Sequence, residues 1–177
     1  MPNNVEMFNL PTEVLSLSSI MGITKLYGGA IESSLPSGII DVSNLRQVPD
    51  NQEVFILEDG PKDISIIFDL LQHNDLGLEA SLKENLDDIF ENYSAGKAEP
   101  IDITVRNSQA LSVTVTAESV VSFVAVIYLS ESDTDVLITV NAPNTSVEEA
   151  KEKYYPILAE ACATFNVVDQ SIFGGIQ

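Results

Sequence analysis

Four consecutive segments rich in Val, Ile and Thr constrain the fold of this chain more than any other feature of its sequence. They are residues 101–107, 110–119, 120–129 and 133–143, separated only by short polar stretches. Residues of these types favour β-strands, and consecutive strands with short connections pair as an antiparallel meander. The nearly continuous apolar run of residues 120–129 predicts a central strand that is covered on both faces.

Three other segments have helical patterns. Apolar residues recur at helical spacing in residues 63–73 and again in residues 78–93. A third helix is predicted to begin after Ser146, which forms a capping box with Glu149, and Pro156 predicts either a kink or two abutting helices. The chain is therefore predicted to adopt an α+β fold, with a mostly antiparallel central sheet and helices on both faces.

The chain is predicted to form one domain preceded by an extension. From residue 25 to residue 177 there is no Gly/Ser-rich linker, repeat or low-complexity tract. Residues 1–24 contain a short apolar patch, but Glu6 and Glu13 stand where a secretory signal would be basic. We therefore predict a loosely attached extension over residues 1–24 and a single domain over residues 25–177, without a transmembrane helix.

The charge of the chain limits the partners that it can have. Its 27 acidic residues against 8 Lys and Arg give a formal net charge of −19. Nucleic acid and anionic membranes both need clustered cationic side chains, so neither is a predicted partner. The charge favours a basic partner surface, although solubility alone would also explain it. The single cysteine, Cys162, cannot form an intrachain disulfide, which indicates a reducing compartment, and we predict that it packs in the core.

Most catalytic and metal sites are excluded by the residues that the sequence contains. His73 is the only histidine, and a general base would need an activated nucleophile beside it, so packing or surface roles are favoured for His73 and Cys162. No phosphate-binding glycine motif is present. The acidic stretch of residues 130–135 lacks the glycine and the distal glutamate of a calcium loop. We predict no enzymatic activity, no cofactor and no metal.

Two acidic residues stand in the stretch RQVPDNQEVF, where a tight turn is predicted to precede a strand over residues 53–57. Pro49 fixes its own φ angle and Asp50 can bond local backbone amides, so the turn is predicted to display Asp50 and Glu53 on a stiff support. Two preset carboxylates suit Arg or Lys on a partner. The alternative is that Asp50 only caps the turn and Glu53 is a solvated residue at the start of the strand.

This block and three other stretches carry a family resemblance. LYGGAI, LPSGIIDVSNLRQVPDNQEVF, DTDVLITVNAP and FNVVDQSIF together resemble the Mog family, the Ran guanine nucleotide release factors. The resemblance runs from Leu26 to Phe173 in family order. Residues 58–116 match only in the type of their elements, and they lack the longer segment between helix and sheet that is associated with other members.

The resemblance implies both a fold and a function. It implies a fold similar to the PsbP-like sandwich, with about six mostly antiparallel strands flanked by helices. It also implies a protein that binds the small GTPase Ran. We further predict that the protein is a non-enzymatic monomer of nucleus and cytoplasm and that it binds Ran in its GTP-bound or nucleotide-free form. The implied role is to release guanine nucleotide, GTP in particular, and to support nuclear protein import.

The resemblance also implies where Ran binds. In the family an acidic cluster at the PD-x-x-E turn is associated with Ran binding, and the matching residues here are Asp50 and Glu53. The predicted neighbours of these two residues in the binding site are Asp41, Arg46, Asn51 and Gln52. Alternatively, Arg46 braces the loop by pairing with Asp41 or Asp50.

Two alternatives of other classes stay open. One is an enzyme or small-ligand-binding protein that uses a pocket between sheet and helices, which a buried His73 near Cys162 would favour. The other is a PsbP-like structural subunit that binds a large assembly through its acidic surface, although such a role expects a targeting sequence and none is visible.

Overall fold

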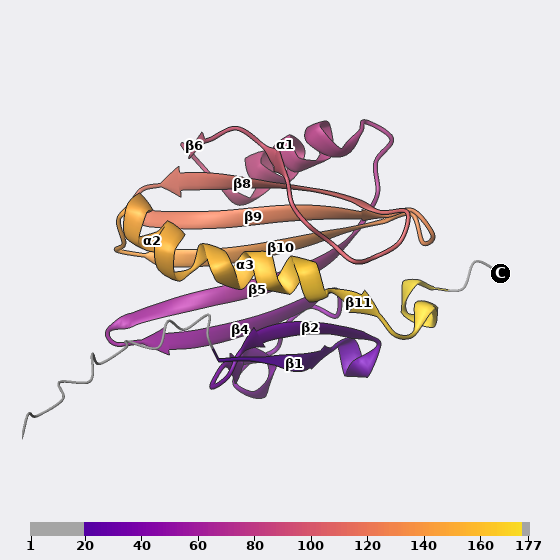
Figure 1. Cartoon of the computed structure of the whole chain (residues 1–177), viewed down its shortest axis with the longest axis horizontal. Coiled ribbons are helices and arrows are strands. Elements are labelled where there is room, and N and C mark those ends of the chain that lie inside the picture. Colours follow the sequence, from indigo (N-terminus) through magenta and orange to yellow (C-terminus); the bar gives the residue numbers. More distant parts are fainter. Residues whose placement is uncertain (1–19, 175–177) are drawn as a thin grey trace, which may run out of the picture.

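The computed structural model describes residues 20–174, which form two antiparallel sheets and three α-helices (Figure 1). The larger sheet has the order β3-β4-β5-β10-β9-β8-β6, and β7 also pairs with β8. Its strands are β3 (Ile40–Asp41), β4 (Gln52–Asp59), β5 (Lys62–Gln72), β6 (Ser94–Ala95), β7 (Glu99–Pro100), β8 (Gln109–Ala117), β9 (Val120–Leu129) and β10 (Thr134–Pro143). The smaller sheet contains β1 (Met21–Leu26), β2 (Ile31–Pro36) and β11 (Asn166–Val167).

The predicted meander of β8, β9 and β10 is confirmed. Each strand pairs antiparallel with the next, and the side chains of β9 from Val121 to Ile127 are all buried. Residues on alternate positions of β9 belong to different cores: Phe123 packs toward one face of the sheet and Val124 toward the other. The central strand is therefore covered on both faces, as its apolar run predicted.

The prediction of a strand over residues 101–107 is wrong, because these residues lie outside every strand. Ile101, Ile103 and Val105 are half-buried against the main core, which is the larger of the two cores and contains Phe123. The residues between them are exposed. The β-favouring residues that predicted a strand thus belong to a segment whose apolar side chains cover the core without a ladder of backbone hydrogen bonds.

The prediction of a helix over residues 63–73 is also wrong. These residues form most of β5, which follows β4 through a two-residue turn at Gly60 and Pro61. Ile64, Ile66 and Phe68 are buried in the main core, and Leu71 packs toward the opposite face. Ile67 and Leu71 are half-buried on the second face of β5, and together with the buried residues of the first face they give spacings that imitate a helix.

The helices cover the two faces of the larger sheet. α1 (Leu78–Ile89) packs Leu82 and Leu86 on one face, and it ends before the predicted residue 93. α2 (Val147–Lys153) and α3 (Tyr155–Thr164) lie on the opposite face, where α3 crosses the sheet (Figure 1). The Ser146 hydroxyl accepts a hydrogen bond from the Glu149 amide at 3.2 Å, and Pro156 stands at the start of the second of two abutting helices. The predicted helix start and the two abutting helices are confirmed, but only the Ser146 half of the capping box forms, because the Glu149 carboxylate accepts a hydrogen bond from Lys153 instead.

The two residues considered for chemistry lie on opposite faces of the sheet. Cys162 is fully buried in α3, as predicted, and burial raises the pKa of its thiol to about 12. His73 follows β5 and contacts Asp135, whose carboxylate also accepts a hydrogen bond from Ser81 of α1. His73 therefore lies on the face of the sheet that α1 covers. The alternative that paired His73 with Cys162 therefore loses its supporting contact.

The N-terminal hairpin joins β1 to β2 through a 3-10 turn, Tyr27–Gly29. Gly28 and Gly29 have φ angles of 68° and 95°, which glycine adopts without strain, so the glycine pair serves this tight turn. β1 begins at Met21, whereas the domain was predicted to begin at residue 25. The remainder of the predicted extension lies outside the described residues. No helix among residues 20–174 is long and apolar enough to cross a membrane.

Candidate functional site

The turn predicted before β4 is present, and hydrogen bonds within it and from two other elements hold it in place. The Gln52 amide donates to the Pro49 carbonyl oxygen at 3.0 Å, and the Asn51 carbonyl accepts from the Leu70 amide at 2.9 Å and the Tyr27 hydroxyl at 3.0 Å. The side chain of Asp50 is exposed and makes no hydrogen bond or ion pair with any residue that the structure describes. Its carboxylate is therefore available on a turn that it does not itself hold together.

Glu53 does not lie in the turn with Asp50. It is the second residue of β4, and its carboxylate accepts a hydrogen bond from the Tyr27 amide at 2.6 Å. Tyr27 has a φ angle of 52°, so this bond holds a residue in the left-handed region that non-glycine residues seldom adopt. The prediction that Glu53 is displayed beside Asp50 is thus corrected: Glu53 is half-buried and supports the N-terminal hairpin.

Two carboxylates behind the turn have raised pKa values. Burial raises the pKa of Glu53, the hydrogen bond from the Tyr27 amide lowers it in part, and the nearby charge of Asp41 raises it further. Burial likewise raises the pKa of Asp69, which Gln52 partly offsets by hydrogen bonding. The charged forms of both groups are therefore less favourable in the folded protein than in water.

Glu53→Gln is expected to change how stability depends on pH. A Gln oxygen can still accept the bond from Tyr27, but Gln does not titrate. Because the folded-state pKa of Glu53 is raised, the folded parent binds more protons than the unfolded chain as pH falls, so its stability relative to Glu53→Gln increases. We expect roughly 0.5 kcal/mol between about pH 7 and pH 5, since the group is half-exposed and screened.

Urea unfolding of both proteins across this pH range measures the effect. Glu58→Gln replaces an exposed glutamate of the same strand and is the matched control. A stability difference between the parent and Glu53→Gln that is independent of pH, or that falls in acid, would contradict the assignment of Glu53 as a half-buried acid.

Asp41 and Arg46, two other predicted neighbours of Asp50, differ in their contacts. Asp41 accepts hydrogen bonds from the Ser43 amide at 2.9 Å and the Ser43 hydroxyl at 2.6 Å, and so caps the 3-10 helix Val42–Asn44. Arg46 is exposed and forms no ion pair with any described residue. The predicted alternative, in which Arg46 braces the loop by pairing with Asp41 or Asp50, is therefore not observed among these residues. Asp41 is thus engaged locally, and Arg46 is open to solvent.

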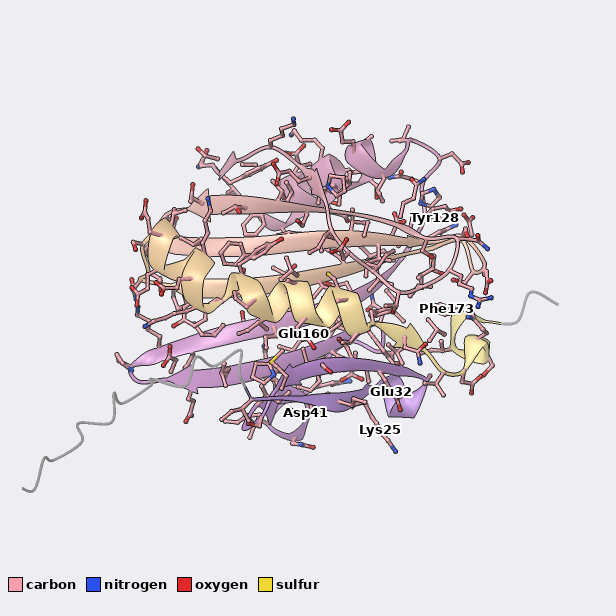
Figure 2. The ribbon with its side chains drawn as sticks, viewed as in Figure 1. Lys25, Glu32, Asp41, Tyr128, Glu160 and Phe173 are labelled. Carbon is pink, nitrogen blue, oxygen red and sulfur yellow. The ribbon has the colours of Figure 1, made fainter. Side chains whose placement is uncertain are left out.

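A groove of about 590 Å³ opens beside Asp50. Leu70 and Leu71 of β5 line it, together with Asp133 of the β9–β10 hairpin and the C-terminal residues Ile172 and Phe173. Figure 2 shows Phe173 and Tyr128, the penultimate residue of β9, at the same end of the molecule. The sequence indicated none of these residues as site residues, although Phe173 closes a stretch that carries the family resemblance.

Comparison with known proteins gives one family. The model of a family described as "Ran-interacting Mog1 protein" matches residues 24–143. The Saccharomyces cerevisiae protein named nuclear import protein MOG1 is 36% identical over an alignment 184 residues long. The alignment covers 84% of this chain and 83% of the yeast protein. The Homo sapiens Ran guanine nucleotide release factor is 55% identical over 47 residues, or 27% of this chain and 24% of the human protein.

Solved structures agree with the fold. The crystal structure of the Saccharomyces cerevisiae Ran-binding protein Mog1p matches with a TM-score of 0.70 and 30% identity, over 86% of this chain and 98% of that chain. The solution structure of cyanobacterial PsbP from Synechocystis matches with a TM-score of 0.50 and 18% identity, over 84% and 92% of the two chains. The predicted α+β sandwich with PsbP-like architecture is confirmed.

Proposed function

Because this chain belongs to the Mog1 family of Ran-interacting proteins, we propose that it binds the GTPase Ran, promotes release of guanine nucleotide from it and supports nuclear protein import. The observation that carries this proposal is the family match over residues 24–143, which includes the acidic turn. The protein acts without bond chemistry, as a monomer in nucleus and cytoplasm. It engages Ran in the GTP-bound or nucleotide-free form.

Asp50 is the proposed point of contact with Ran. Its carboxylate is exposed, has no partner among the described residues and projects from a turn that Leu70 and Tyr27 hold. Such a group can pair with Lys or Arg without first breaking an internal contact, and little conformational entropy is lost when it binds. Asn51 and Gln52 border this contact, and Arg46 and Asp41 lie farther along the same stretch.

Glu53 has an indirect part in this proposal. It holds the Tyr27 amide, and the Tyr27 hydroxyl in turn donates to the Asn51 carbonyl at 3.0 Å. Removing the Glu53 side chain would therefore loosen the turn that positions Asp50. Glu53 acts as a positioning residue, and Asp50 provides the charge that Ran meets.

Release of nucleotide follows from a preference between states of Ran. If the protein binds nucleotide-free Ran more tightly than Ran loaded with GTP, reciprocity requires that it weakens the binding of GTP by the same factor. A preference of about 100-fold corresponds to about 2.7 kcal/mol of coupling free energy. Because this mechanism only redistributes binding energy, it needs no catalytic residue.

The direct test measures nucleotide release. Ran is loaded with a fluorescent GTP analogue, this protein is added in excess with unlabelled GTP, and the decay of fluorescence is followed. We expect release to accelerate with protein concentration and the protein to bind nucleotide-free Ran more tightly than GTP-loaded Ran. Unchanged release, together with no complex with nucleotide-free Ran, would overturn the proposed function.

A further inference from the structure

The groove beside Asp50 is assembled around the end of β5 from several separate parts of the chain, and three of them form its main walls. In the sheet β5 lies between β4 and β10, and the register pairs Gln52 with Asp69 on one side and Thr134 with Gln72 on the other. The turn that carries Asp50 and the hairpin that carries Asp133 therefore flank β5. The C-terminal 3-10 helix, Gln170–Phe173, adds the third wall.

The groove combines negative charge with apolar surface. Asp50 and Asp133 are the charged residues that line it, and no Lys, Arg or His is among its lining residues. Its apolar surface comes from two leucines of β5 and from Ile172 and Phe173. Two strand spacings, about 10 Å, separate the strands next to the two carboxylates, so the carboxylates suit two cationic side chains better than one.

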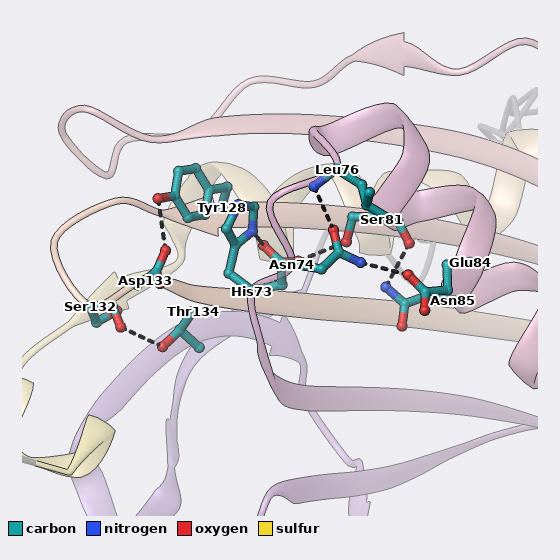
Figure 3. Close-up of polar contacts among 11 residues, drawn as sticks. His73, Asn74, Leu76, Ser81, Glu84, Asn85, Tyr128, Ser132, Asp133 and Thr134 are labelled. Carbon is teal, nitrogen blue, oxygen red and sulfur yellow. Dashed lines mark hydrogen bonds and ion pairs between the residues drawn. The ribbon is translucent and has the colours of Figure 1, made fainter.

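Asp133 is held in position by contacts outside the groove (Figure 3). One of its carboxylate oxygens accepts a hydrogen bond from the Tyr128 hydroxyl at 3.0 Å. The Tyr128 ring stacks on His73 with 3.9 Å between centroids, and His73 Nδ1 lies 2.8 Å from the buried Asp135 carboxylate. The exposed carboxylate of Asp133 is thus held in place by neighbouring side chains, just as the turn that carries Asp50 is held by Leu70 and Tyr27.

We infer that this groove binds a basic, partly apolar segment of the GTPase, in which cationic side chains pair with Asp50 and Asp133 and apolar atoms contact Ile172 and Phe173. The inference rests on the proposed function and extends its binding site from one acidic turn to the β9–β10 hairpin and the C-terminal 3-10 helix. Charge complementarity supports it, because both carboxylates face a groove that offers them no cation.

Asp133→Asn tests the charge of the second wall. Asn keeps an oxygen for the Tyr128 hydroxyl and tolerates the φ angle of 50° at this position, so the charge is the main property lost. Glu131→Gln removes an exposed charge from the same hairpin, outside the groove, and is the matched control. We expect Asp133→Asn to weaken binding of nucleotide-free Ran about five-fold, against less than two-fold for Glu131→Gln.

Phe173→Ala tests the apolar wall. Because Phe173 is half-buried, its truncation is expected to weaken Ran binding about ten-fold through lost apolar contact, and thermal unfolding of the variant shows whether the domain itself is intact. The effect of Asp133→Asn should shrink as salt rises from about 0.1 M to about 1 M, whereas that of Phe173→Ala should persist.

The possible outcomes separate this inference from the function beneath it. If the parent fails to bind Ran, the proposed function and the inference fall together. If the parent binds and Asp50→Lys weakens binding about 100-fold, while Asp133→Asn and Phe173→Ala bind within two-fold of the parent, the groove is overturned and the proposed function stands. Selective losses in both groove variants, with Glu131→Gln unaffected, support the groove.

Discussion

Asp50→Lys is expected to weaken binding to nucleotide-free Ran by about 100-fold and to abolish accelerated nucleotide release, because a like charge opposite a cationic partner costs several kcal/mol. Asp50→Ala loses the pair without adding repulsion, so a smaller loss of about ten-fold is expected. Calorimetric titration of nucleotide-free Ran with each variant measures the affinities, and the fluorescent-nucleotide assay measures release.

The structure provides a matched control for this charge reversal. Glu58 is an exposed acid near the far end of β4, so Glu58→Lys changes the net charge equally on the same strand. Neither side chain is buried, and both variants should unfold within about 0.5 kcal/mol of the parent. Equal losses of Ran binding in Asp50→Lys and Glu58→Lys would show that only net charge matters, and negligible losses in both would remove Asp50 from the site.

The structure assigns different roles to two acids that the sequence presented as a pair. Asp50 has no partner among the described residues, and Glu53 accepts a hydrogen bond from the Tyr27 amide. Loss of Ran binding in a Glu53 variant would therefore report a displaced turn as much as a lost charge. Glu53→Gln separates the two effects because it keeps an acceptor for Tyr27 and removes only the charge.

Local sequence signals predicted the elements whose causes are local. The composition and short connections of residues 110–143 predicted β8 to β10, and Ser146 with Pro156 predicted the start and division of the C-terminal helices. β5 was missed because Ile67 and Leu71 on its half-buried face interrupt the apolar alternation of its buried face. Residues 101–107 alternate without pairing, so the pattern recorded burial and not a hydrogen-bonded strand.

The sequence predicted only the part of the site that lies in one contiguous stretch of the chain. Asp50 lies within a stretch that resembles a family motif, so its position could be predicted from the sequence alone. The contact between Tyr27 and Glu53 joins residues 26 positions apart, and the groove depends on how β4, β5, β10 and the C-terminal 3-10 helix meet. No local pattern encodes such contacts, because tertiary packing creates them.

A buried polar cluster joins α1 to the larger sheet. The Asp135 side chain of β10 is almost fully buried; one oxygen lies 2.8 Å from His73 Nδ1, and the other accepts from the Ser81 hydroxyl at 2.7 Å (Figure 3). Three elements thus meet at one carboxylate: the end of β5, the first turns of α1, and β10. A buried charge of this kind is tolerated only while its hydrogen-bond partners are present.

Asp135→Ala is expected to lower the free energy of unfolding by about 3 kcal/mol, because it leaves His73 and Ser81 without their acceptor in a buried site. Ser81→Ala removes one donor and should cost about 1 kcal/mol. Urea unfolding measures both, with the exposed Glu131→Ala as control, and amide exchange in α1 should accelerate selectively in Asp135→Ala. A stability loss no larger than that of the control would mean that packing by Leu82 and Leu86 alone holds α1 on the sheet.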